Sequence, residues 1–194
     1  MRRGLVSLAI FFAFVAIYTL SRHTTTTTTT TTTAASASTT TTTVTGSTAA
    51  CTGSDFSGAY NTGEGAAGTI YATVTLTKTS PGSCAADGYP TLTLLDRLGA
   101  VLTSRTVDVP GQSTAVTFLD SRAKPAPTRH VVASGATLTF SLAYSDVPTG
   151  SQTTCPSAQT VSVGFAAGES SAPVTPAVAP APCDGGLVWV SPLY

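Results

Sequence analysis

The chain has 194 residues, of which only 9% are charged, and its nine basic and nine acidic side chains cancel to a formal net charge of zero. An ordinary soluble domain carries about 25% charged residues, and here threonine, serine, alanine, glycine and proline take their place. Because no excess of basic side chains is present to neutralise phosphates, the sequence predicts no nucleic-acid partner.

The first segment, residues 1–23, holds an uncharged hydrophobic run at residues 4–20 between Arg3 and Arg22. As a helix this run would span roughly 26 Å, against about 30 Å for a hydrocarbon core. We expect a transmembrane anchor with the following domain outside the cytoplasm, since flanking arginines can reach the headgroups. The alternative is secretion after cleavage of a signal peptide, whose apolar region is typically only about 7–15 residues.

Residues 24–50 form a second segment of low complexity. Threonine fills positions 24–33 and 39–43 without interruption, and alanine and serine occupy most of the remainder. Nothing here can bury enough apolar surface to offset the entropy of ordering the chain, so we expect a disordered linker of roughly 30 Å r.m.s. length. Such Thr/Ser-rich stalks are typical sites of O-glycosylation.

From residue 51 onward, apolar and polar side chains alternate. Residues 70–77 place Ile70, Ala72, Val74 and Leu76 on one side, opposite Tyr71 and threonines. The same period recurs at residues 136–144, 161–165 and 187–189, which is typical of half-buried antiparallel strands. Shorter strands are predicted at residues 55–60, 91–96, 100–107, 114–119 and 130–133.

Turn signals separate these strands, and no segment beyond residue 50 carries a helical stripe. Glycine and proline cluster at residues 63–68, 80–82, 98–99, 110–111 and 148–150. We therefore predict that residues 51–194 form one all-β domain, a two-sheet antiparallel immunoglobulin-like sandwich.

The four cysteines, Cys51, Cys84, Cys155 and Cys183, are widely spaced and form no C-x-x-C pair. Behind an export signal this pattern predicts two disulfides rather than free thiols or a zinc site. First and last strands often lie side by side in sandwiches, so we predict a Cys51–Cys183 bond. That leaves Cys84 with Cys155, in loops before strands that we expect to be neighbours.

Candidate catalytic residues are sparse. His130 is the only histidine of the domain, it stands at a predicted strand start, and no G-x-S-x-G elbow accompanies it. Two of the scattered carboxylates could serve a glycosidase, but Asp87-Gly88 and Asp184-Gly185 are typical turn sequences, and no calcium-loop motif occurs. We predict no catalytic site, no metal site and no cofactor.

The motif Gly88-Tyr89-Pro90 is predicted to be structural, with a ligand contact through Tyr89 as the alternative. Glycine permits a bend, the tyrosine ring can pack while its hydroxyl finds a partner, and proline suits the start of an edge strand. Trp189, in the last predicted strand with Leu187, is expected to pack in the core.

The order of these features resembles the actinobacterial exported family called domain of unknown function 4232. The resemblance covers nearly all of residues 51–194: an opening cysteine, a second cysteine before Gly88-Tyr89-Pro90, two later cysteines, and Val190-Ser191-Pro192 at the end. The segment 100–129 is longer than the corresponding part of the family pattern and differs from it in sequence. The resemblance implies a secreted or envelope-anchored β-sandwich and no known activity, so it supplies no functional residues.

Together these patterns predict a membrane-anchored extracytoplasmic module with a non-enzymatic binding or structural role in the cell envelope. We expect residues 4–20 to contact the membrane and the domain to contact an envelope protein or polymer. The alternative is an exported hydrolase that acts on cell-wall or glycan substrates. The sequence specifies neither the partner nor the oligomeric state.

Overall fold

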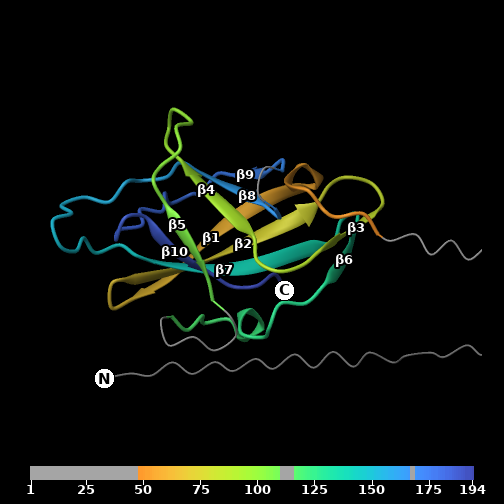
Figure 1. Ribbon diagram of the computed structural model, residues 1–194, viewed down its shortest axis with the longest axis horizontal. Helices are drawn as coiled ribbons and strands as arrows, with labels where there is room; N and C mark the ends of the chain where they lie inside the picture. The colour runs from red at the N-terminus through yellow and green to blue at the C-terminus, as the bar shows by residue number, and fades with distance from the viewer. Residues whose placement is uncertain (1–47, 110–115, 167–168) are drawn as a thin grey trace, which may run out of the picture. The chain divides into compact units, whose positions relative to one another are not determined.

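The computed structural model of the chain describes residues 48–109, 116–166 and 169–194, and in these ranges its regular elements are strands and two short 3-10 helices (Figure 1). The predicted all-β class is therefore confirmed. In chain order the elements are η1 (Gly53–Asp55), β1 (Phe56–Ala66), β2 (Thr69–Lys78), β3 (Ser83–Ala86), β4 (Thr91–Leu95), β5 (Arg105–Asp108), η2 (Ser121–Ala123), β6 (His130–Ala133), β7 (Thr137–Ser145), β8 (Thr160–Gly164), β9 (Ala172–Val174) and β10 (Leu187–Val190).

The largest sheet has five strands in the order β1-β2-β7-β10-β5. At its centre, β2 and β7 are antiparallel, and their register places Val74 opposite Phe140 and Leu76 opposite Leu138. The alternation read from the sequence produces this pairing, since each of these four side chains is at most 2% exposed and all lie on the same face. The pair β5–β10 is parallel, which the antiparallel prediction did not foresee.

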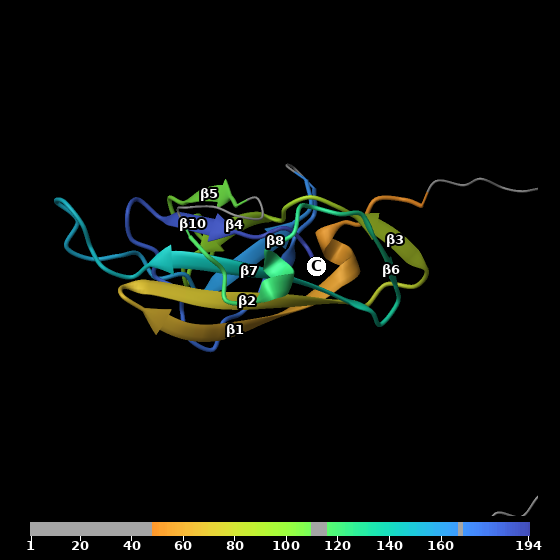
Figure 2. The ribbon, with the colours of Figure 1, turned by 90° about the horizontal axis from the view of Figure 1, so that it is seen from below.

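Two smaller sheets complete the domain: β4-β8-β9 with three strands and β3-β6 with two. Figure 2 shows β4 and β8 in a layer facing β2 and β7. The main hydrophobic cluster joins these layers, because it contains Val74 and Phe140 from the large sheet together with Leu94, Val161 and Val163 from the three-stranded sheet. Burial of these aliphatic and aromatic side chains is the main source of stability.

The opposite face of the large sheet carries a second, smaller cluster. Val116, Phe118 and Ala123 are buried there against Ala143 of β7, and Trp189 packs beside them. Trp189 is only partly buried, so it belongs to this outer cluster and not to the main core in which it was expected. The segment 116–123 thus covers one part of the outer face of the sheet.

The predicted strands at residues 70–77, 136–144, 161–165 and 130–133 correspond to β2, β7, β8 and β6. Within the prediction for residues 114–119, the described residues 116–119 form no strand, because Val116 and Phe118 pack onto the sheet without joining its ladder. Two strands were missed, β3 and β9. Both are very short, and β9 has Pro173 at its centre, which strand patterns count as a breaker.

The predicted disulfide pairing is wrong, although all four cysteines form disulfides. The bonds join Cys51 to Cys84 and Cys155 to Cys183, each with a Cα–Cα distance of 4.9 Å. Cys51 lies beside β3, since its N–H donates to the Ala85 carbonyl at 2.8 Å. The last strand, β10, was expected beside the first strand, but it pairs with β5 and β7 instead.

The predicted anchor at residues 4–20 and the predicted linker at residues 24–50 fall, apart from residues 48–50, outside the residues that the structure describes. In the part of the chain that is described, no helix has the length and apolarity needed to span a membrane.

The two disulfides give a direct test of this topology. We expect non-reducing peptide mapping to find Cys51 linked to Cys84 and Cys155 linked to Cys183. Removal of either bond by paired Cys→Ala substitution should cost about 3.5 kcal/mol through the larger entropy of the unfolded chain. The Cys51/Cys84 pair should cost more than the Cys155/Cys183 pair, because Cys51 and Cys84 are both buried whereas Cys155 is partly exposed.

Thermal unfolding of the two double variants measures this difference, with a fall in melting temperature of roughly 10 °C for the milder one. A cross-linked peptide that joins Cys51 to Cys183 would contradict the observed arrangement.

Candidate functional site

The outer face of the five-stranded sheet contains a cavity of about 140 Å³. We call it the outer-face pocket. Strands β1, β2 and β7 and the segment before η2 supply its lining residues, which are Gly63, Tyr71, Ala72, Thr73, Phe118, Leu119, Asp120 and Ser141. It lies on the side of the sheet that does not face the main core.

The floor of the pocket follows from the alternation in β2. With Ala72 and Val74 directed into the core, Tyr71 and Thr73 face outward, and Ser141 of β7 stands opposite Thr73 in the ladder. Gly63 of β1 borders this floor. A Cβ atom at Gly63 would lie 2.5 Å from the Tyr71 carbonyl oxygen, so this close approach requires glycine.

One wall of the pocket is built by residues 118–120. Phe118 is buried on the sheet, whereas the side chain of Leu119 is 66% exposed and turns toward solvent. Asp120 then ends the wall as the N-cap of η2, where its carboxylate accepts a hydrogen bond from the Arg122 N–H at 2.9 Å. The wall is therefore apolar along its length and carries one charge at its end.

A chain of polar side chains fixes that charge. The Arg122 guanidinium bonds the Asp120 carboxylate at 2.7 Å and lies 5.0 Å from the centroid of the Tyr194 ring. The Tyr194 hydroxyl is 3.3 Å from Asp120 Oδ2 and 3.0 Å from Ser141 Oγ. Segments far apart in the sequence thus meet at one rim of the pocket.

The network changes the acidity of both of its titratable acids. Hydrogen bonds from Arg122 favour the ionised carboxylate and hold the pKa of Asp120 below its ordinary value. Burial favours the neutral phenol and raises the pKa of Tyr194. Both groups therefore keep their usual protonation states at neutral pH, with Asp120 charged and Tyr194 neutral.

The pocket offers an apolar recess with the Asp120–Arg122 ion pair at its rim. Hydrolysis of a glycoside by the usual route needs two carboxyl groups on either side of the bond. Asp120 is the one carboxylate among the described residues that line the pocket, and its oxygens are already engaged by Arg122 and Tyr194. The chemistry that this arrangement supports is shape-specific binding of an apolar group.

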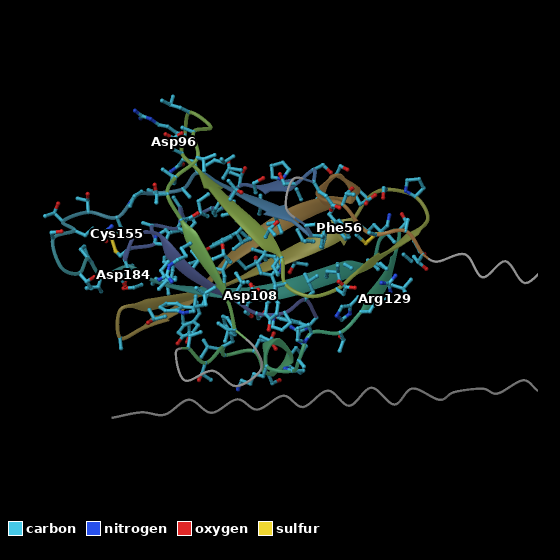
Figure 3. The ribbon with its side chains drawn as sticks, in the orientation of Figure 1. Phe56, Asp96, Asp108, Arg129, Cys155 and Asp184 are labelled. Carbon is cyan, nitrogen blue, oxygen red and sulfur yellow. A yellow bond between two sulfur atoms is a disulfide. The ribbon has the colours of Figure 1, made fainter. Side chains whose placement is uncertain are left out.

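His130 is not among the residues that line the pocket. Its Nε2 atom is 3.1 Å from the Leu193 carbonyl oxygen and 3.1 Å from Thr128 Oγ1. None of the hydrogen bonds or ion pairs among the described residues joins it to a carboxylate. Within residues 48–109, 116–166 and 169–194, no three histidine, cysteine, aspartate or glutamate side chains gather as a metal site would require. Figure 3 shows Asp96, Asp108 and Asp184 on three separate parts of the fold.

The motif Gly88-Tyr89-Pro90 packs against the end of the chain. Gly88 has a φ of 76°, and its carbonyl accepts a hydrogen bond from the Leu193 N–H at 3.1 Å. Tyr89 is partly buried beside the main core, and burial raises the pKa of its hydroxyl. Pro90 is buried. These contacts place the motif in the packing of the domain, outside the outer-face pocket.

The pocket residues were not identified from the sequence. Tyr71 gave the one usable signal, since it is a large aromatic residue on a strand face otherwise occupied by threonine. Phe118 and Asp120 are brought to Tyr71 only by the folding of residues 116–123 onto the sheet. The sequence around these residues therefore does not indicate that they contact each other.

The lowered pKa of Asp120 predicts a pH dependence of stability. A carboxylate whose pKa is lower in the folded state stabilises the fold above its unfolded pKa of about 3.9, and this contribution is lost as the pH falls through the folded value. At pH 7, Asp120→Asn should therefore be less stable than the parent protein. The difference should shrink steadily below about pH 4.

Urea unfolding of both proteins between pH 7 and pH 2.5 tests this expectation. Asp146→Asn is the matched control, because it alters an exposed carboxylate outside the network. A difference between Asp120→Asn and its parent that stays constant over the whole pH range would show that the charge of Asp120 contributes nothing.

The family of this chain is established by comparison with known proteins. The model of the family described as Domain of unknown function (DUF4232) matches residues 51–194, which include all the strands and both disulfides. None of the curated proteins and none of the solved structures matches the chain. The expected cysteine pattern is present, since the four cysteines at these positions form two bonds. The chain thus belongs to the family of the domain of unknown function DUF4232.

Proposed function

We propose that this protein is a membrane-tethered, extracytoplasmic, non-enzymatic binding module that receives an apolar side chain of an envelope protein in its outer-face pocket. The observation that carries the proposal is the pocket itself, an apolar recess with an exposed leucine on its wall and a fixed carboxylate at its rim. Interfaces commonly place such apolar anchors within a polar border.

The size and lining of the pocket favour a protein side chain over a cofactor or a sugar chain. Sites for whole small molecules usually measure about 300–1,000 Å³, whereas a cavity of about 150 Å³ accommodates one benzene ring. The outer-face pocket, at about 140 Å³, matches a single aromatic or branched aliphatic group. A wall polysaccharide would instead need several converging hydrogen-bonding groups, whereas the surface of this pocket is predominantly apolar.

The same geometry supports a role without catalysis. A hydrolase would need a second acid or an activated nucleophile beside Asp120, and neither is among the described lining residues. Ser141 donates to or accepts from Tyr194, whose raised pKa keeps the phenol protonated at neutral pH, so that it is not available as a base to activate the serine. No observation favours the hydrolase alternative specifically.

The disulfides support an extracytoplasmic location. All four cysteines are oxidised in pairs, and such bonds persist in secreted and envelope proteins but are rare in the reducing cytosol. We propose that residues 4–20 hold the protein in the membrane and that the domain lies outside.

As for the fold, we propose an immunoglobulin-like two-layer sandwich, supported by the packing of β4 and β8 against β2 and β7 around one core.

Leu119→Ser tests the role of the pocket. We expect this change to weaken capture of the envelope partner at least tenfold, about 1.4 kcal/mol, because it removes an apolar contact at the wall of the pocket. Leu98→Ser is the matched control, since Leu98 is 83% exposed on the loop after β4. Both variants should unfold at the temperature of the parent protein.

The measurement is a binding titration of full-length protein in lipid vesicles with the envelope protein captured by the parent chain. If Leu119→Ser and Leu98→Ser bound that protein equally well, the pocket would not be the contact. Retention of purified wall polysaccharide at similar strength by the parent and Leu119→Ser would point to a polymer ligand and contradict the proposal.

A further inference from the structure

Strand β1 leaves one edge of the five-stranded sheet without a strand partner. It is the first strand in the order β1-β2-β7-β10-β5 and pairs only with β2 (Figure 2). Among the residues that the structure describes, no hydrogen bond reaches the outer edge of residues 56–62. A long edge of this kind can accept a further strand.

The register shows which backbone groups point toward the free edge. The Thr79 N–H donates to the Asp55 carbonyl at 2.8 Å, which makes Asp55 and Thr79 a hydrogen-bonded pair just before the strand. Because such pairs alternate in an antiparallel ladder, Ser57, Ala59 and Asn61 direct their backbone groups toward β2. The N–H and C=O groups of Gly58, Tyr60 and Thr62 consequently point away from the sheet.

The other edges of the two larger sheets are protected. Strand β5 is short and carries Arg105 and Asp108, and the three-residue β9 contains Pro173. On β4, the Leu94 carbonyl is occupied by the Leu102 N–H at 2.8 Å. Charge, proline and covering segments are the usual means of preventing edge association.

In the part of the chain that the structure describes, residues 56–62 of β1 have none of these protections. They read Phe-Ser-Gly-Ala-Tyr-Asn-Thr, without charge or proline, and the irregularity in the ladder begins only after Thr62. The outward side chains of Ser57, Ala59 and Asn61 are exposed and small. The side chains of β1 on this face therefore leave room for a second strand to lie beside residues 56–62.

We propose that two copies of this chain pair through β1, antiparallel and centred on Ala59, to form one continuous ten-stranded sheet. The sequence of β1 is compatible with itself under this two-fold symmetry, since Ser57 would oppose Asn61 and Ala59 would oppose its own copy. The stretch that would pair, residues 56–62, contains no charged residue; Glu64 of one copy and Asp55 of the other would lie beyond its ends, past the irregularity that begins after Thr62.

A cysteine at position 59 tests this pairing. Ala59 and its copy would form a non-hydrogen-bonded pair with Cα atoms about 4.5 Å apart, which is within the range for a disulfide. Under mild oxidation of the full chain in lipid vesicles, Ala59→Cys should give at least tenfold more covalent dimer than Ala126→Cys, an exposed position on another segment. Equal dimer yields from the two variants, or a cross-link from position 59 to a different protein, would overturn the proposal.

Opposite charges provide a second test that does not depend on a new thiol. Ala59→Lys alone and Ala59→Glu alone should each lower the fraction of dimer at least tenfold in sedimentation of the detergent-solubilised full chain, because like charges would face each other. An equimolar mixture of the two variants should restore dimers that contain one copy of each. If the mixture stayed monomeric, or if each variant dimerised like the parent, the two-fold pairing through Ala59 would be wrong.

Discussion

The pairing of β2 with β7 is the interaction on which the rest of the domain depends. These two strands share an unbroken antiparallel register from Thr69 and Ser145 to Thr77 and Thr137. Every other strand of the large sheet attaches to one of the two or to a strand that does. Their inner side chains are the centre of the main core, against which the three-stranded sheet packs. Loss of this ladder would leave neither layer with a surface to bury.

The same ladder also builds the outer-face pocket, because a strand with alternating side chains presents two different surfaces. Val74 and Phe140 lie on the inner face, while Tyr71, Thr73 and Ser141 lie on the outer face. The inner face is fixed by the need to exclude water, and it tolerates little change. The outer face is less constrained, and a segment from elsewhere in the chain covers only part of it. A recess arises where this cover ends.

The sequence predicted those strands whose side chains are buried on one face only and whose length exceeds a few residues, such as β2 and β7. It did not predict β3 or β9, because Ser-Cys-Ala-Ala in β3 shows no alternation of polar and apolar residues and β9 has Pro173 at its centre. Missing β3 led directly to the wrong disulfides, because β3 is the element that brings Cys84 to Cys51. The pocket could not be predicted at all, since its floor and its wall meet only through tertiary packing.

The bond between Cys51 and Cys84 also determines how the domain responds to mechanical load. Cys51 lies at the start of the domain, and the bond closes a loop that contains β1 and β2. A pull exerted on the chain ahead of Cys51 passes through the sulfur atoms to Cys84 and bypasses residues 52–83. The hairpin of β1 and β2 is therefore shielded from tension, and it cannot be peeled from the sheet by a force that enters from that end.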